Sequence, residues 1–168
     1  AIKSTDKGAK IFHTYGSDEF DVVVSTIPLP IVSNILKSGG ASKEIVNQYA
    51  SQKSVACACV IIETSKKITD NFWTNINDKR FKIPGIIEFS NLRYIGRHIC
   101  YIPFYMPKNN KDYIRPNSYF IKDSIECIKA INTSISDEDI INSCCNRYEF
   151  AQPVYSPNFT DSLPDINP

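Results

Sequence analysis

The sequence predicts an α+β fold: a mixed, largely antiparallel sheet of about five or six strands, with helices packed mainly on one face. Two observations lead to this class. The middle of the chain holds several strand-like runs at short spacing, and consecutive strands of this kind tend to pair antiparallel. Stretches with helical periodicity lie on both sides of that β-rich middle.

The first elements are two predicted strands, over residues 10–15 and 20–25, joined by a turn-rich link at 16–19. The second contains three consecutive valines at 22–24, so we predict a strand buried on both faces. It stops at Ser25 and Thr26, and Pro28 then opens a helix. Ligands bind at the carboxyl ends of strands in open α/β sheets, which makes this turn a candidate site.

Two short helices should follow. Apolar residues recur at helical spacing over 29–37, and Gly39-Gly40 provides a stop signal. A second helix is predicted over 42–51, with Ser42 as its N-terminal cap.

The β-rich middle predicts strands over 55–62, 72–76, 86–91 and 98–106. Cys57 and Cys59 alternate along the first of these and should share one face. Pro103 interrupts the last run, which favours an edge position or a bulge.

Helical periodicity then returns, with isoleucines at 121, 125, 128 and 131 on one face. Residues 136–139 resemble a capping box and predict a further helix, whose buried side would be Ile140, Ile141 and Cys144. From Arg147 onward the sequence reads as extended and proline-bearing.

Composition excludes several function classes. The chain has 168 residues, 42% of them hydrophobic, and a net charge of +1, so nothing favours nucleic acid or an anionic membrane as a partner. No apolar run reaches the roughly 20 residues of a membrane span, and no secretory signal is visible. The six cysteines are interpreted as buried reduced thiols, so we expect a cytoplasmic protein.

Few residues are suited to catalysis. The two histidines, His13 and His98, are not spaced with carboxylates or cysteines for a metal site, and no nucleophile has a visible base. No catalytic residue or metal ligand is therefore predicted.

Aromatic residues indicate a ligand-binding site more clearly than any of these residues indicates catalysis. Trp73, Tyr101 and Tyr105 lie in predicted strands, where they could line an apolar ligand pocket or simply pack in the core. Arg97 and Arg147 could bind an anionic group or remain solvated surface residues.

Four stretches together resemble FAD-dependent oxidoreductases of the amine oxidase and protoporphyrinogen oxidase superfamily, to which UDP-galactopyranose mutase-like flavoproteins are related. They are residues 20–30, residues 72–78 with 84–92, residues 101–105, and residues 147–155. Their order and spacing, which span roughly residues 11–166, are more specific than any single motif.

The resemblance implies a parent flavoenzyme that oxidises a small or medium organic substrate. It implies cofactor contacts at Ser25, Thr26 and Pro28, and substrate contacts at Trp73, Tyr101 and Tyr105. Arg97 and Arg147 are further substrate-binding candidates, because they could bind an anionic group. The family's Gly-x-Gly-x-x-Gly motif, which binds the FAD pyrophosphate at a helix N-terminus, is missing from the sequence. We therefore expect this chain to be a substrate-domain fragment that neither retains FAD nor is active alone.

In this interpretation residues 1–27 are a remnant hairpin of the FAD domain, 28–160 the substrate-binding domain, and 161–168 the start of the return to the FAD domain. The expected partners are a small-molecule substrate, the FAD domain, and a second copy of the chain, because an uncovered sheet face favours dimers. Two alternatives stay open: a free-standing α+β binding module, and a flavin-dependent mutase that grips a diphosphate with an arginine pair.

Overall fold

A computed structural model describes residues 1–164. It divides into two compact units: the first is Ala1–Ser54 with the described residues from Gln152 onward, and the second is Val55–Ala151. The second unit is thus an insertion into the first. The assignment of residues 1–27 and 28–160 to cofactor and substrate domains concerns function and stays a prediction.

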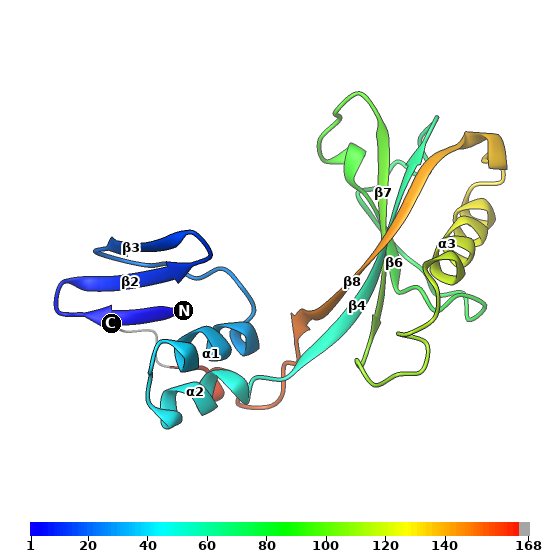
Figure 1. The fold of residues 1–168 in the computed structure, drawn as a ribbon. Helices are drawn as coiled ribbons and strands as arrows, with labels where there is room; N and C mark the ends of the chain where they lie inside the picture. Colours follow the sequence, from blue (N-terminus) through cyan, green and yellow to red (C-terminus); the bar gives the residue numbers. More distant parts are fainter. Residues whose placement is uncertain (165–168) are drawn as a thin grey trace. The chain divides into compact units, whose positions relative to one another are not determined.

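The first unit contains a three-stranded antiparallel sheet of β1 (Ile2–Thr5), β2 (Gly8–His13) and β3 (Gly16–Phe20) (Figure 1). Gly8 and Gly16 each have a φ above +140°, a backbone conformation that suits glycine at the tight turns before β2 and β3. The predicted strand over 10–15 therefore exists, two residues earlier than expected.

The predicted buried strand over residues 20–25 is wrong. Only Phe20 belongs to a strand, and Val22 and Val24 are 77% and 81% exposed. Valine favours extended backbone, but burial also needs a neighbouring strand, and within residues 1–164 none pairs with 21–26.

Both predicted N-terminal helices are confirmed as α1 (Leu29–Ser38) and α2 (Lys43–Ala50). Ser42 caps α2, because its hydroxyl accepts the Ile45 N–H at 3.3 Å. Gly39 ends α1 at a close approach to β1, where a Cβ would lie 1.6 Å from the Ile2 carbonyl oxygen. The glycine thus fixes how closely α1 and β1 pack.

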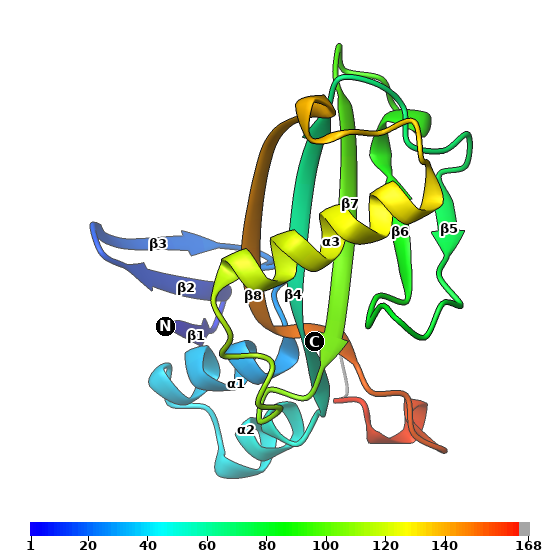
Figure 2. The same cartoon turned by 90° about the vertical axis from the view of Figure 1, so that its right-hand side faces the viewer.

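The inserted unit is built on a five-stranded sheet in the order β5-β6-β7-β4-β8 (Figure 2). Its strands are β4 (Ser54–Thr64), β5 (Trp73–Asn75), β6 (Gly85–Glu88), β7 (His98–Met106) and β8 (Ile140–Pro153). β7 pairs antiparallel with β4 in unbroken register, from Ala56 opposite Met106 to Thr64 opposite His98. The predicted α+β class is confirmed.

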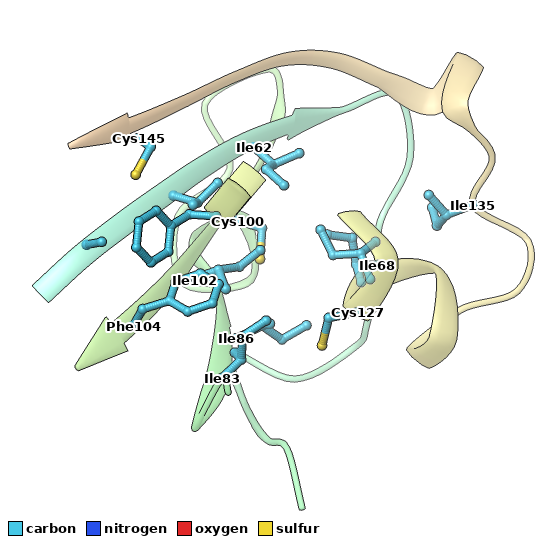
Figure 3. Close-up of a cluster of buried hydrophobic side chains, with 14 residues drawn as sticks. Ile62, Ile68, Ile83, Ile86, Cys100, Ile102, Phe104, Cys127, Ile135 and Cys145 are labelled. Atoms are coloured by element: carbon cyan, nitrogen blue, oxygen red, sulfur yellow. The ribbon is translucent and has the colours of Figure 1, made fainter. Parts of the chain in front are cut away.

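The helix α3 (Asn117–Ile131) crosses one face of this sheet and covers the hydrophobic core (Figures 1 and 2). Figure 3 shows the core side chains gathered between α3 and the strands. Phe104 and Phe120 meet edge to face with ring centroids 5.1 Å apart. The inward positions of the strands alternate with outward ones, so the core takes Ala58, Val60, Ile62, Cys100, Ile102 and Phe104.

The predicted helix after residue 136 is wrong beyond its first turn. Ser136 and Asp139 do form a capping box, but the helix is only the 3₁₀ turn η2 (Asp137–Asp139), and the long strand β8 follows. Two other 3₁₀ turns occur, η1 (Phe89–Asn91) and η3 (Thr160–Ser162). η1 replaces the second half of the strand predicted over 86–91.

Pro103 lies in β7 between two neighbouring strands, so the predicted edge position or bulge is wrong. β6 pairs with β7 only at Cys100 and Tyr101, so this pairing does not reach Pro103. Proline has no backbone N–H, but no hydrogen bond to β6 is needed at this position.

The cysteines are all free: four are buried, Cys59 is half-buried, and Cys144 on the edge strand is exposed, against the prediction that all six are buried. Among residues 1–164, no helix combines the length and hydropathy that a bilayer crossing requires. The predicted return segment 161–168 lies partly outside the described residues.

Candidate ligand-binding face of the inserted sheet

The face of the five-stranded sheet opposite α3 carries no α-helix of the same unit and holds an apolar hollow of about 340 Å³. This volume is at the lower end of the range of small-molecule sites, about 300–1,000 Å³. The hollow is lined by Cys57, Cys59, Ile87, Tyr101, Pro103, Tyr105, Tyr148, Phe150 and Ala151. We name these residues the thiol–tyrosine hollow.

Strand alternation places these side chains together. Tyr101, Pro103 and Tyr105 are two residues apart on β7 and point to the same face, as predicted for the two tyrosines. Cys57 lies directly opposite Tyr105, and Cys59 directly opposite Pro103. The predicted shared face of the two cysteines is confirmed as well.

Burial favours the neutral forms of the two thiols and of Tyr105 in the hollow. Burial raises the pKa of Cys57 to about 12, with a smaller contribution from neighbouring Cys59. Burial likewise raises the pKa of Cys59 and of the Tyr105 hydroxyl. No Asp, Glu, His, Lys or Arg is among the lining residues. The hollow can thus bind apolar groups, but it offers no thiolate nucleophile and no general base at neutral pH.

Trp73 lies on the same face as the hollow, beside its lining residues. It pairs with Ile87 across β5 and β6, and Ile87 pairs with Tyr101 across β6 and β7. A Cβ on Gly85 would lie 3.1 Å from the Trp73 ring, so the glycine lets the ring lie against the β6 backbone. The structure thus brings Trp73, Tyr101 and Tyr105 onto one face, and their predicted contact with substrate stays a prediction.

A second, smaller hollow of about 100 Å³ adjoins this face at the other end of β4, lined by Ile61, Glu63, Ile99, Asn142, Ser143 and Cys144. Arg97 lies 3.7 Å from the Glu63 carboxylate. Ile61 pairs with Tyr101, so the same cross-strand pair borders both hollows. The face therefore has an apolar end and a polar end.

Arg147 is not brought to the hollow. Its guanidinium donates to the carbonyl oxygens of Tyr113, at 2.8 Å, and Arg115, and it also donates to the Asn117 side chain. It lies over the Phe120 ring of α3, 5.4 Å from the centroid. The donors of Arg147 are thus used on the α3 side of the sheet.

The remaining candidates lie elsewhere. Ser25, Thr26 and Pro28 form the exposed link before α1 in the first unit, and their contact with a cofactor stays a prediction. His13 pairs with Asp18 at 2.8 Å across a hairpin. Within residues 1–164, no cluster of three or more His, Cys, Asp or Glu side chains is suited to hold a metal ion.

Three solved structures resemble this chain in fold. A protoporphyrinogen oxidase-type protein from Exiguobacterium sp. 255-15 gives a TM-score of 0.62 at 14% identity, over 96% of this chain and 36% of that one. Reduced UDP-galactopyranose mutase gives 0.59 at 17% identity, over 86% of this chain and 32% of that one. An oxidoreductase from Methanosarcina mazei gives 0.60 at 13% identity, over 89% of this chain and 36% of that one.

The likeness establishes the fold. This chain has the fold of about one third of these larger enzymes. No protein-family model and no curated protein matches the sequence.

Sequence reasoning misses several lining residues of the hollow. Tyr148, Phe150 and Ala151 escape it because the segment from Arg147 onward is predicted to be extended but nothing in the sequence indicates that it pairs beside β4. The signal that could have found them is the alternation of polar and aromatic residues from Arg147 to Phe150, which is typical of a half-buried strand.

Proposed function

We propose that this chain forms the substrate-binding portion of an FAD-dependent oxidoreductase that acts on a small or medium organic substrate. The observation that carries the proposal is the thiol–tyrosine hollow on a sheet face that α3 leaves open. Pockets for organic molecules are mainly apolar and aromatic with a few oriented polar groups, and here tyrosine hydroxyls supply the latter.

The proposal also draws on the fold likeness to two oxidoreductases and on the sequence resemblance to FAD-dependent enzymes. In such enzymes the flavin supplies the redox chemistry, and the protein supplies binding and orientation. The described residues do not form a dinucleotide cradle: Ser25 and Thr26 are exposed, and no Gly-x-Gly-x-x-Gly unit is present. We therefore derive no catalytic step through FAD from this chain.

UDP-galactopyranose mutase is also among the similar folds, which keeps a mutase as a second candidate. A diphosphate substrate would need cationic side chains at the open face. Arg147 donates to carbonyl oxygens on the other face, and Arg97 is placed beside Glu63. Because neither arginine is free to bind a diphosphate at the open face, these positions favour an oxidoreductase over a mutase.

The test compares two proteins. The 168-residue chain should purify without a flavin absorption band, whereas the product of the entire reading frame that encodes it should carry FAD. Amines and cyclic organic compounds should then bleach the flavin band under anaerobic conditions. A full-length product without flavin would overturn the proposal, and so would FAD bound stoichiometrically by this chain alone.

A further inference from the structure

We infer that the thiol–tyrosine hollow selects an uncharged, apolar ring system and rejects an anionic one. This inference deepens the proposed function by naming the substrate class of the same site. It depends on the hollow's lining, not on FAD.

The first argument is charge. All nine lining residues lack a formal charge at neutral pH, and the two thiols and Tyr105 stay protonated because they are partly removed from water. An anion that entered the hollow would give up water without gaining a cationic partner, which is costly. An uncharged ring gives up little and gains apolar contact.

The second argument is shape and composition. Tyr101, Pro103 and Tyr105 on β7 lie between Ile87 on β6 and the two cysteines on β4, and β8 adds Phe150 beyond the cysteines. Aromatic walls prefer flat partners, which they meet in stacked or edge-to-face geometry. The Tyr105 side chain is 44% exposed, so a ligand can reach its ring and hydroxyl.

The third argument concerns the nearest cations. Arg97 lies at the polar end of the face and is placed 3.7 Å from Glu63, and Arg147 is hydrogen-bonded to carbonyl oxygens. Neither lines the hollow. An anionic group of the ligand therefore finds no complementary charge there.

The experiment uses a matched pair of probes with one ring system. Dansylamide is uncharged, and 5-(dimethylamino)naphthalene-1-sulfonate carries a negative charge. Trp73 is the only tryptophan and lies on the same face as the hollow, so energy transfer from it reports binding near this sheet, and the variants below locate the site. The full 168-residue chain should bind dansylamide at least ten-fold more tightly than the sulfonate, a difference of about 1.4 kcal/mol.

A charge-introducing variant supplies the specificity test. Tyr148→Lys places a cation at a lining position that is 54% exposed, so β8 should tolerate it. This variant should lose at least ten-fold in dansylamide affinity and should bind the sulfonate more tightly than the parent chain does. The matched control Tyr94→Lys changes a tyrosine that is 64% exposed and does not line the hollow, and it should alter neither affinity.

Three results would overturn the inference: neither probe binds, the sulfonate binds the parent chain as tightly as the amide, or Tyr94→Lys acts like Tyr148→Lys. These results are independent of flavin content. A full-length protein without FAD would therefore refute the proposed function while leaving the charge preference of the hollow standing.

Discussion

At the residue scale, the two candidate arginines have opposite structural importance. Arg147 donates to the Tyr113 and Arg115 carbonyls and so holds the segment before α3 against β8. Arg147→Ala should lower the free energy of unfolding by about 2 kcal/mol, because hydrogen bonds that involve a charged group contribute about 1.5–3 kcal/mol. Urea denaturation followed by circular dichroism measures this loss.

The control for that prediction is Arg97→Ala. Arg97 is exposed and has only a 3.7 Å ion pair with Glu63, so its removal should change stability by no more than about 0.5 kcal/mol. Equal losses in the two variants would contradict the anchoring role of Arg147.

The thiols give a second prediction at this scale. Cys144 is exposed, whereas burial raises the pKa of Cys57 to about 12 and keeps it a thiol at neutral pH. Because the thiolate is the nucleophile, iodoacetamide at about pH 7.5 should label Cys144 in the folded chain and leave Cys57 unlabelled. Peptide mass spectrometry reads out the sites, and labelling in urea serves as the control, since all six cysteines should then react.

At the element scale, the buried Glu88 at the end of β6 holds the loop that follows β4. Its carboxyl oxygens accept the N–H groups of Ile68, at 3.0 Å, and Thr69, at 2.6 Å. Glu88→Gln replaces one acceptor with a donor that faces a backbone N–H. This should lower the free energy of unfolding by about 1–3 kcal/mol, the usual cost of an unsatisfied buried polar group.

Glu149→Gln is the matched control for Glu88→Gln. Glu149 accepts only from Lys108 at the surface, so its loss should change stability by less than about 1 kcal/mol. If the Glu88 variant is as stable as this control, Glu88 does not anchor the loop.

Local patterns predict most elements whose partners are close in sequence or whose periodicity is strong. The predicted range of β7 matches the strand at both ends, and that of α1 is correct to within one residue. Two kinds of strand are missed: β1 and β3, whose mostly exposed residues show little hydrophobic alternation although both pair with nearby β2, and the first half of β8, whose partner is distant. β8 pairs beside β4, about eighty residues earlier in the chain, and helical spacing at Ile140, Ile141 and Cys144 gives no sign of that neighbour.

The candidate site is predictable only in part, for the same reason. The alternation of side chains along β7 is enough to place Tyr101 and Tyr105 on one face. Cross-strand neighbours, such as Cys57 opposite Tyr105, follow only from the register of β4 against β7. The hydrogen bonds that direct Arg147 away from the hollow come from a loop, where no periodic pattern exists.

At the scale of the whole molecule, buried thiols couple stability to alkaline pH. The pKa of Cys57 is raised to about 12 and that of Cys127 to about 11, in each case mainly by burial. In the unfolded chain these thiols lose their protons near pH 9, while the folded chain keeps them. Below about pH 8 these thiols should therefore add no pH dependence to the free energy of unfolding. Above about pH 9 the free energy of unfolding should fall as the pH rises.

Urea titrations at about pH 7.5, 9 and 10 measure this decline. Tyrosine and lysine titrate in the same range, so the variant Cys57→Ala isolates the thiol: its stability should fall less steeply than that of the parent chain. An identical slope in both proteins would show that Cys57 does not contribute.

The way the inserted unit joins the chain has a consequence for how such proteins diversify. Val55–Ala151 leaves and re-enters through β4 and β8, which are neighbouring strands, and beyond them the Val154 N–H meets the Lys53 carbonyl oxygen at 2.9 Å. The two connections therefore lie side by side. A different module with two adjacent strand ends could therefore replace the inserted sheet without moving the flanking residues.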